Sequence, residues 1–459
     1  MARSERIQVQ RGESLDLVEH DLELSVAGFK SIRERRRLRV APLTIVSGAN
    51  SSGKSSFFQP LLLLKQTIEA TFDPGVLLIN GPNLRFTLQD QLLSKAKSST
   101  SRLKQFTVGM RVGQNARELT FATSGSGLRL AVDEATVGDA SLRITDPLTR
   151  RAEAQINEQF GEQAREIGTM LWRARGERGQ RPSSDYRVNV ERNRCFFEPH
   201  IEVATSEADS IRFSAGFDAV SWINLAREII HVPGLRGNPE RSYPRTAVED
   251  TFPGTFETYV ASVVHALGDR HDRVLSDVIG DLEQLGLTWK LVARRVDDSS
   301  VELLVGRMPH AQQGGANDLV SVADVGFGVS QTLPVVLALR VARPGQIVIV
   351  EQPEIHLHPR AQVIMARLLV AAAARGVRVI SETHSSLLLR SIQTFIARGD
   401  LSPSEVSVNW FSRNANDGAT DIFTAEVDEN GSFGDWPVDF EDVAQAADWE
   451  YIEAVSARA

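Results

Sequence analysis

The residues best suited to chemistry in this sequence lie at Gly48–Ser55, which read GANSSGKS. They fill the spacing G-x-x-x-x-G-K-[ST], in which two glycines let the backbone curl around phosphate groups. Successive N–H groups of such a loop point at phosphate oxygens, and the following helix adds its positive end. Lys54 would supply a cation for the outer phosphates, and Ser55 a hydroxyl ligand for Mg²⁺. The pattern predicts a binding site for a nucleoside triphosphate such as ATP.

The elements on either side of this loop are those that the chemistry requires. The apolar strand Leu43–Val46 precedes the loop, and a helix with the apolar block Leu61–Leu64 follows it. A chance match to the pattern, as a plain Gly- and Ser-rich turn, would usually lack these two neighbours. We therefore expect a set of adjacent residues to bind the nucleotide: Gly48, Ala49, Asn50, Ser51, Ser52, Gly53, Lys54, Ser55 and Ser56.

A second group of candidate residues follows the apolar segment Ile347–Val350, far downstream in the chain. Glu351 ends this predicted strand, and Gln352, Pro353 and Glu354 come next. A buried parallel strand delivers its last side chain to the carboxyl edge of the sheet, where nucleotide sites form. We expect Glu351 to be the acid of a Walker B motif that holds Mg²⁺ through water, so Ser55 and Glu351 are the predicted metal ligands.

A third short strand, Val377–Ile380, leads into Ser381–Ser385, which read SETHS. A lone histidine more often has a structural role. Because His384 lies at the carboxyl end of the strand after the Walker B strand, we expect it to sense the γ-phosphate.

A glycine-punctuated turn between the two nucleotide motifs opens an apolar helix that runs through Leu339. Such a turn is common by itself. Just ahead of a Walker B strand it indicates a signature segment, whose helix N-terminus would contact the γ-phosphate held by a second subunit. The predicted nucleotide contacts of this segment are Asp324, Gly326, Gly328, Ser330 and Gln331.

The composition bounds the class of protein. With 459 residues and 42% hydrophobic content, the chain can bury a large core in more than one domain. No apolar run is long enough to cross a bilayer, and the first residues are charged throughout, so we expect a cytoplasmic protein with no membrane partner. The single cysteine, Cys195, excludes an internal disulfide framework and fits a reducing compartment.

The formal net charge of −8 argues against a general polyanion binder, but two local arginine clusters leave nucleic acid as a possible partner. One interpretation of the clusters is a solvated face or the protection of an edge strand. The other is a surface for DNA, RNA or an acidic partner. The clusters are Arg33, Arg35, Arg36, Arg37 and Arg39, and Arg173, Arg175, Arg178 and Arg181.

The middle of the chain has the pattern of an insertion. Alternating apolar and polar residues from Phe106 to Ile144 predict a small antiparallel sheet, and Ile156–Leu171 has helical spacing. Two further helices are predicted near Val220–Ile230 and Phe256–Leu285, to close a helical subdomain that carries the signature segment.

These elements predict a chain in three parts. Residues 1–95 would form the first half of an ATPase domain, with the Walker A loop. Residues 290–459 would complete its sheet with the signature segment, the Walker B strand, His384 and a C-terminal β segment. Residues 96–289 would be the inserted β and helical region.

Several segments together resemble the RecF/SMC/OLD-like branch of ABC-type ATPases. Within that branch the sequence is similar to bacterial AAA-family ATPases found in stand-alone genes and anti-phage defence operons. The resemblance spans residues 22–95 and 231–440. It rests on GFKSI (28–32), LTIVSGANSSGKSS (43–56), HVPGLRGNPERSY (231–243), VGFGVSQTLP (325–334), EQPEIHLHP (351–359), ETHS (382–385) and VDENGSFGDWP (427–437).

The resemblance implies an α/β P-loop NTPase of ABC-type architecture. Its central, mostly parallel sheet has flanking helices, with an antiparallel β subdomain and a helical signature subdomain inserted. Two subunits would face head to tail, each ATP lying between the P-loop of one and the signature segment of the other. By the same resemblance Lys54 and Ser55 bind the triphosphate and the metal, Glu351 holds Mg²⁺, His384 senses the γ-phosphate and His356–Pro359 form the D-loop. Together with Glu354, which is considered next, Lys54, Glu351 and His384 are the predicted catalytic residues. Arg236 or Arg241 would neutralise charge across the interface, unless each is simply an exposed loop arginine.

One departure from the wider ABC class concerns Gln352, which occupies the position of the catalytic glutamate. A glutamine cannot accept a proton from the attacking water, and general-base help is worth about 10²–10⁴-fold. Either Glu354 takes over this role, or hydrolysis is slow and the ATP-bound dimer persists.

The resulting hypothesis is a nucleotide-driven switch for a separate effector protein in prokaryotic antiviral defence. The segment after His384 contains no Asp-x-Asp pair of the kind used by OLD-family nucleases, so we expect no TOPRIM nuclease domain. One alternative is a RecF-like repair ATPase that clamps DNA when ATP is bound. Another is a scaffold that binds nucleotide without hydrolysing it.

Overall fold

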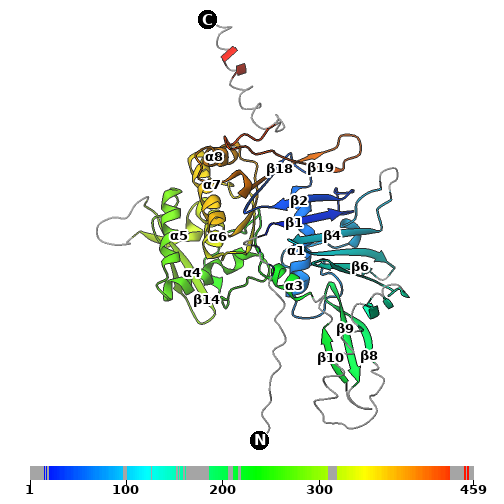
Figure 1. Ribbon diagram of the computed structural model, residues 1–459. Helices are drawn as coiled ribbons and strands as arrows, with labels where there is room; N and C mark the ends of the chain where they lie inside the picture. Colours follow the sequence, from blue (N-terminus) through cyan, green and yellow to red (C-terminus); the bar gives the residue numbers. More distant parts are fainter. Residues whose placement is uncertain are drawn as a thin grey trace. The chain divides into compact units, whose positions relative to one another are not determined.

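The computed structural model of the chain describes residues 20–96, 101–125, 127–150, 186–204, 210–214, 219–308 and 318–434, with residues 15, 17, 153, 154, 156–158, 161, 449, 450, 452 and 453 (Figure 1). The arginine cluster at Arg173–Arg181, most of the helix expected at Ile156–Leu171 and the last residues of the segment 427–437 lie outside the described residues. The chain divides into two units. Unit 1 comprises Met1–Leu38 and Ser56–Glu228, and unit 2 comprises Arg39–Ser55 and Ile229–Ala459.

A six-stranded sheet forms the centre of unit 2. In spatial order its strands are β11 (Ile230–Val232), β16 (Ile347–Glu351), β17 (Arg378–Glu382), β3 (Leu43–Gly48), β18 (Val406–Arg413) and β19 (Thr420–Thr424). All neighbouring pairs are parallel except β18 with β19. All six residues of β3 are buried, as expected for a strand inside a parallel sheet. The predicted mostly parallel sheet is confirmed.

Three helices of unit 2 pack around this sheet: α6 (Phe327–Val341), which precedes β16, α7 (Pro359–Ala374), which follows β16, and α8 (Ser386–Ala397), which follows β17. Helix α6 contacts β11 and β16, α7 contacts β17 and β3, and α8 packs on α7 (Figure 1). Side-chain caps fix where two of them start. His358 accepts a hydrogen bond from the Arg360 N–H at the start of α7, and Ser385 accepts one from the Leu388 N–H at the start of α8.

A helical and β subdomain precedes α6 in unit 2. Its elements are β12 (Tyr243–Pro244), the 3₁₀ helix η2 (Phe256–Tyr259), α4 (Val260–Asp269), α5 (Arg273–Gln284), β13 (Leu291–Arg295), β14 (Ser300–Gly306), β15 (Leu319–Ser321) and the 3₁₀ helix η3 (Val322–Asp324). Helix α5 packs on α6, and Arg340 of α6 donates two hydrogen bonds to the buried carboxylate of Asp281 on α5. This pair holds the helix that begins at the signature segment.

The single helix predicted near Phe256–Leu285 is wrong, because the chain breaks between α4 and α5. His271 has a φ of +50°, outside the helical region, and the Asp272 carboxylate accepts a hydrogen bond from the Val274 N–H. Asp272 is therefore the N-cap of a new helix rather than an interior residue. The helix predicted near Val220–Ile230 is α3 (Val220–Arg227), which belongs to unit 1, and Ile230 begins β11.

Unit 1 contains the antiparallel sheet predicted between Phe106 and Ile144, extended by two earlier strands. In spatial order the strands are β2 (Arg36–Val40), β1 (Leu22–Ala27), β4 (Gln105–Val112), β5 (Asn115–Ser124), β6 (Gly127–Val137) and β7 (Ala140–Thr145). Arg117 of β5 and Asp133 of β6 form a buried ion pair, with an N–O distance of 2.6 Å. Asp133 also accepts a hydrogen bond from the Phe197 N–H, so this pair links the sheet to the hairpin that follows it.

The remaining elements of unit 1 are helix α1 (Lys54–Glu69), whose first two residues belong to unit 2, the 3₁₀ helix η1 (Gln89–Gln91), and the sheet of β8 (Tyr186–Asn193), β9 (Phe196–Ala204) and β10 (Ser210–Ser214). Cys195 is buried next to this hairpin, and burial raises the pKa of its thiol. In the part of the chain that the structure describes, no helix combines the length and apolar character needed to cross a bilayer. The division of the chain at residues 95 and 289 stays a prediction.

Candidate nucleotide-binding site

The loop Gly48–Gly53 connects the buried strand β3 directly to the first turn of α1, at Lys54. Gly48 and Gly53 have φ values of +140° and +100°, and Ser51 has a φ of +61°. At Gly48 a Cβ atom would lie 2.0 Å from the Phe411 carbonyl oxygen of β18. Only glycine fits at this position, so the close approach of β18 to Gly48 fixes where the loop begins to turn.

The Lys54 side chain lies back across the loop. It is 4% exposed, and its Nζ donates hydrogen bonds to the carbonyl oxygens of Gly48, at 3.0 Å, and Ala49, at 2.9 Å. Burial lowers the pKa of Lys54, and the Glu382 carboxylate offsets part of this change. The ammonium group is thus held inside the curl that the sequence predicts to surround phosphate groups.

Two carboxylates end adjacent strands beside this loop. Glu351 of β16 pairs in register with Glu382 of β17, and Glu382 pairs in register with Val46 of β3. Glu382 Oε2 accepts a hydrogen bond from Ser55 Oγ at 2.8 Å. Burial raises the pKa of Glu382, and nearby Glu351 raises it further. Sequence reasoning missed Glu382, although it is the first residue of the ETHS segment and the last of its strand.

Both oxygens of Glu351 have partners within unit 2. Oε1 lies 3.4 Å from Nε2 of His231, the middle residue of β11, and Oε2 accepts a hydrogen bond from the Gly234 N–H at 3.1 Å. Burial alone would raise the pKa of Glu351, but these contacts outweigh it and leave the pKa below its ordinary value. Glu351 is therefore a charged carboxylate of fixed orientation.

Glu354 and His384 meet next to these two carboxylates. Glu354 Oε1 accepts a hydrogen bond from the His384 N–H at 2.8 Å, whereas Oε2 is buried with no hydrogen-bond partner among the described residues. Burial raises the pKa of Glu354. Burial lowers the pKa of His384, and the Lys54 ammonium lowers it further, which places the imidazole near the phosphate loop. The structure thus brings together all four predicted catalytic residues: Lys54, Glu351, Glu354 and His384.

The signature segment is separate from this cluster within one chain. Gly326 is the N-cap of α6, and Asp324, Gly326 and Phe327 are exposed. Ser330 Oγ donates to the Phe327 carbonyl oxygen. In the described part of the chain, no hydrogen bond joins residues 324–331 to residues 48–56.

Residues 43–390 match the protein family described as "AAA domain, putative AbiEii toxin, Type IV TA system". This match covers most of the chain and includes β3, β16 and β17, the strands that carry the phosphate loop, Glu351 and Glu382. The chain belongs to this family. It is accordingly a P-loop ATPase with an AAA domain and the nucleotide-binding function of that class, and the predicted α/β fold with a mostly parallel central sheet agrees with the structure.

Comparison with solved structures gives distant similarities of this ATPase to SMC head domains. An SMC head bound to the C-winged helix domain of ScpA has 12% identity, a TM-score of 0.45, and coverage of 89% of this chain and 98% of that chain. For an SMC head with an extended coiled coil bound to the C-terminal domain of ScpA, from Pyrococcus furiosus, the values are 11%, 0.44, 88% and 96%. For the SMC head of Thermotoga maritima they are 10%, 0.36, 89% and 99%. No curated protein matches the ATPase.

Arg236 has a structural position in the ATPase that its sequence pattern did not indicate. It is 4% exposed, and its guanidinium donates to the carbonyl oxygens of Gln331, at 2.9 Å, and Glu351, at 2.5 Å. In return, the Gln331 amide donates to the carbonyl oxygens of Arg236 and Gly237. We call these reciprocal contacts the Arg236–Gln331 clasp. The clasp joins the end of the Walker B strand to the signature helix α6.

Burial lowers the pKa of Arg236 to about 10. Arg236 is therefore buried rather than an exposed loop arginine, whereas the Arg241 side chain is 74% exposed and paired with Asp324. A role for Arg241 across an interface stays a prediction. The Gln331 side chain, predicted to contact nucleotide, is 6% exposed and is bound within the clasp.

The oxygen groups beside the phosphate loop fit Mg²⁺ that enters together with a nucleotide better than a metal ion bound by protein side chains alone. Among the described residues of the ATPase, no group of three or more His, Cys, Asp or Glu side chains is arranged to hold a metal. Ser55 Oγ and the Glu351 carboxylate are oxygen groups of the kind that Mg²⁺ prefers, and they would hold the ion together with phosphate and water oxygens. The buried hydroxyl of Ser52 has no hydrogen-bond partner in the described structure either, as expected for a loop built around a ligand.

Proposed function

We propose that this ATPase binds ATP with Mg²⁺ at the site in unit 2, hydrolyses it slowly, and uses its nucleotide state to control a separate effector protein. The observation that carries the proposal is the convergence of the phosphate loop with Glu351, Glu354, Glu382 and His384 at one edge of the parallel sheet. That edge is where open α/β sheets bind ligands.

In this proposal each residue near the loop has one task. The N–H groups of residues 48–56 and the Lys54 ammonium bind the phosphates, and Ser55 and Glu351 hold Mg²⁺. When bound, Mg²⁺ neutralises charge on the phosphate oxygens. Glu382 accepts a hydrogen bond from the Ser55 hydroxyl and so fixes the direction of the hydroxyl lone pairs.

Glu354 is the proposed general base in place of Gln352. Its Oε2 is buried without a partner among the described residues, and its raised pKa is closer to neutrality, where a base works best. The His384 N–H holds the other oxygen, so the carboxylate has a fixed direction. His384 would at the same time sense the γ-phosphate with its imidazole, next to Lys54.

Self-association follows from the position of the signature segment. Asp324, Gly326, Gly328 and Ser330 form no hydrogen bond with the loop of their own chain in the described structure, and the start of α6 is exposed. We infer that this segment completes the nucleotide site of a second copy, with the helix N-terminus directed at the γ-phosphate. ATP would then hold a head-to-tail homodimer together.

The effector protein and the antiviral role are proposed from similarity rather than from the geometry of the site. The matched family is described in terms of a toxin and a toxin–antitoxin system, and the sequence resembles ATPases of anti-phage operons. In this proposal the ATPase works in the cytoplasm, where it releases or restrains a partner with each nucleotide cycle. A nuclease or toxin gene directly beside this one would support this role.

The alternative of a DNA clamp gains no support from the arginine cluster near residue 35. Arg35 forms paired hydrogen bonds with the Glu118 carboxylate, and Arg37 lies 3.9 Å from Glu23. Because β2 is an edge strand, these charges fit the protection of an exposed edge. A clamp would lose DNA affinity steeply with salt, whereas an effector switch would not.

The decisive experiment measures two properties of the pure protein with ATP and Mg²⁺. Steady-state phosphate release is compared for the wild type and for the Glu351→Gln and Glu354→Gln variants, and molar mass is followed by light scattering. We expect slow release by the wild type, loss of release in both variants, and an ATP-dependent doubling of mass. If the wild type releases no phosphate above background, only a non-hydrolysing scaffold remains.

A further inference from the structure

The segment 231–237 of unit 2 contacts the carboxylate of the Walker B strand at both of its oxygens. His231 Nε2 lies 3.4 Å from Glu351 Oε1, and the Gly234 N–H donates to Oε2 at 3.1 Å. Glu351 can therefore take up a further partner only if it shares or gives up one of these contacts. The position of the segment depends on what Glu351 binds.

The other end of this segment is fixed to α6 by the Arg236–Gln331 clasp. The Gln331 side-chain amide donates to the carbonyl oxygens of Arg236 and Gly237, at 2.6 and 3.0 Å, and the Arg236 guanidinium donates to the Gln331 carbonyl oxygen at 2.9 Å. Arg236 is 4% exposed and Gln331 is 6% exposed, so water competes little for these hydrogen bonds. The start of α6 should therefore follow a movement of the segment.

The Arg236 guanidinium also holds the backbone just after the Walker B strand. It donates to the carbonyl oxygens of Glu351 and Gln352, at 2.5 and 3.3 Å. Gln352 has a φ of +48°, which is uncommon for a residue other than glycine. Such conformations persist where the surrounding structure enforces them, and they are frequent in switch regions. Arg236 thus joins α6 to a turn whose backbone is held in a strained conformation.

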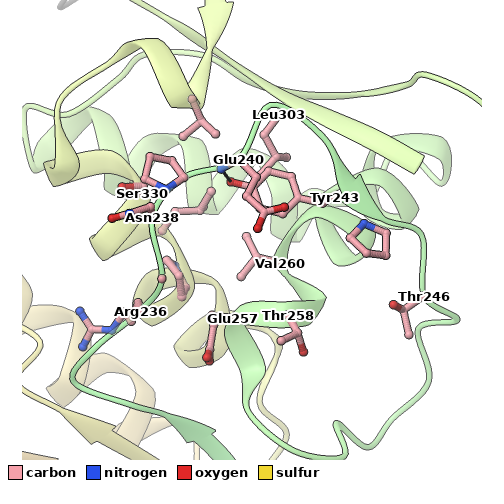
Figure 2. Close-up of a pocket in the computed structure, with 16 residues that line it drawn as sticks. Arg236, Asn238, Glu240, Tyr243, Thr246, Glu257, Thr258, Val260, Leu303 and Ser330 are labelled. Atoms are coloured by element: carbon pink, nitrogen blue, oxygen red, sulfur yellow. Dashed lines mark hydrogen bonds between the residues drawn. The ribbon is translucent and has the colours of Figure 1, made fainter. Parts of the chain in front are cut away.

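A pocket of about 370 Å³ lies next to the clasp, between the same two parts of unit 2. Residues 236–240 line it on one side, and Ser330 and Pro334 of α6 line it on another. Figure 2 shows the Arg236 guanidinium directed away from this space, which Val260 borders. Because protein interiors are otherwise close-packed, a helix can shift only where there is space. The pocket gives the start of α6 room for a small displacement.

We propose that Arg236 and Gln331 are positioning residues that transmit the state of Glu351 to the signature segment of the same chain. When Glu351 takes up Mg²⁺ with the nucleotide, it shares or gives up its contacts with the segment 231–237. The segment then shifts, and the clasp moves the start of α6 into the position in which a second copy can use it. This inference rests on the proposed function, because it requires ATP and Mg²⁺ at the site.

A fluorine reporter at the start of α6 tests the coupling within one chain. Phe327 is 51% exposed, whereas Cys195, the single cysteine of the sequence, is buried. A thiol reagent that carries a trifluoromethyl group should therefore label a Phe327→Cys variant selectively. The label is read by ¹⁹F NMR at concentrations at which light scattering shows a monomer, so that no second copy contributes. Calorimetry on the same sample measures ATP binding.

We expect ATP with Mg²⁺ to shift the ¹⁹F resonance, and ATP with EDTA to bind without this shift, because only the former engages Glu351. Gln331→Met removes both side-chain donors at similar volume. In the labelled protein it should keep the affinity for ATP with Mg²⁺ within about twofold but reduce the shift by at least about half. Arg236→Lys keeps the charge but not the fork of donors, so we expect the same reduction.

Gln284→Met, at an exposed position of α5, is the matched control and should keep the full shift. A full shift in Gln331→Met and Arg236→Lys would overturn the proposal, and one of the two variants decides if the other does not fold. A full shift with ATP and EDTA, or no shift in the intact clasp although ATP and Mg²⁺ bind, would overturn it as well. All three results leave the proposed function standing. If none of the labelled proteins binds ATP, the proposed function is refuted, and the coupling with it.

Discussion

Ser55 Oγ, in the first turn of α1, donates a hydrogen bond of 2.8 Å to Glu382 Oε2 at the end of β17. Glu351 ends the neighbouring strand in the same register, so two carboxylates lie side by side where the phosphate loop ends. The Glu382 carboxylate gives the Ser55 hydroxyl a fixed acceptor. A role for Glu382 in ATP hydrolysis is therefore the most direct consequence of the geometry.

Replacement of Glu382 by glutamine should test this relationship. The amide keeps the shape of the side chain but removes the charge that orients the Ser55 hydroxyl. We expect phosphate release to fall about tenfold, the usual scale for a charged hydrogen-bond partner. Glu426→Gln, at an exposed position, is the matched control in the same assay. Equal rates for the two variants would assign Glu382 a purely structural role.

Lys54→Ala removes the ammonium group that is held inside the loop. Its two carbonyl acceptors can turn to water, so the fold should persist while the phosphates lose their cation. We expect phosphate release to drop about 100-fold or more, with ATP affinity reduced in calorimetry. The exposed Lys104→Ala variant should behave as the wild type. ATP binding of wild-type strength by Lys54→Ala would contradict the assignment of the loop.

Glu354 should set the acid limb of the pH–rate profile. As a general base it works only when deprotonated, and burial raises its pKa, so activity should increase with pH through a value above that of an ordinary glutamate. Glu354→Gln should lower the rate about 10²–10⁴-fold and remove this limb. A variant that keeps both rate and limb would exclude Glu354 as the base.

The raised pKa of Glu354 also predicts how the free energy of unfolding changes with pH. A carboxyl whose pKa is raised by folding contributes stability that is lost as pH increases through the raised value. Glu354→Gln has no such loss, so its free energy of unfolding relative to the wild type should increase from pH 4 to pH 7. Urea unfolding at the two pH values measures this difference, and a constant difference would contradict the prediction.

Gly48→Ala should be among the most damaging single changes. The new Cβ would lie 2.0 Å from the Phe411 carbonyl oxygen, at a backbone φ of +140°. We expect a loss of about 3 kcal/mol or more in the free energy of unfolding, from strain and overpacking together. Gly75→Ala has a φ of +87° but nothing within 4 Å of the new atom, so it should cost only about 1 kcal/mol. Similar losses in denaturant titrations would refute the contact with β18.

Phe327→Ala tests self-association apart from nucleotide binding. Phe327 is 51% exposed at the start of α6 and stacks on His356 of the predicted D-loop, with ring centroids 5.9 Å apart. We expect the ATP-dependent increase in molar mass to disappear, while ATP still binds to the monomer, with an affinity reduced only by the loss of the second copy's contacts. Phe423→Ala, at a 41% exposed position of β19, should leave the increase intact. An unchanged increase in Phe327→Ala would place the dimer contact elsewhere.

The phosphate loop and the Walker B strand could be predicted because each is formed by residues that are adjacent in the sequence. The strand, loop and helix around Gly48–Ser55 are a continuous pattern, and β3 and α1 have the predicted positions. The Walker B strand likewise ends at Glu351, as its apolar run and terminal acid indicate. Identity and spacing of residues were enough for these elements.

The relationships between distant segments were not predictable. Glu382 contacts Ser55 only because β17 lies between β16 and β3, and strand order is not written in the sequence of any one strand. Arg236 is a charged residue in a loop, and such residues are normally exposed. Its guanidinium is nevertheless buried, and it donates hydrogen bonds to three backbone carbonyl oxygens, one in α6 and two at or just after the end of β16. Each of these features is set by tertiary pairing rather than by local propensity.

The central strand β3 takes both of its neighbours, β17 and β18, from the far end of the chain. During translation the phosphate loop therefore leaves the ribosome long before the strands that support it, and its closure must wait for nearly all of the polypeptide. A nascent or prematurely terminated chain would lack the geometry to capture nucleotide. ATP-dependent activity therefore requires a chain that has been translated through β18.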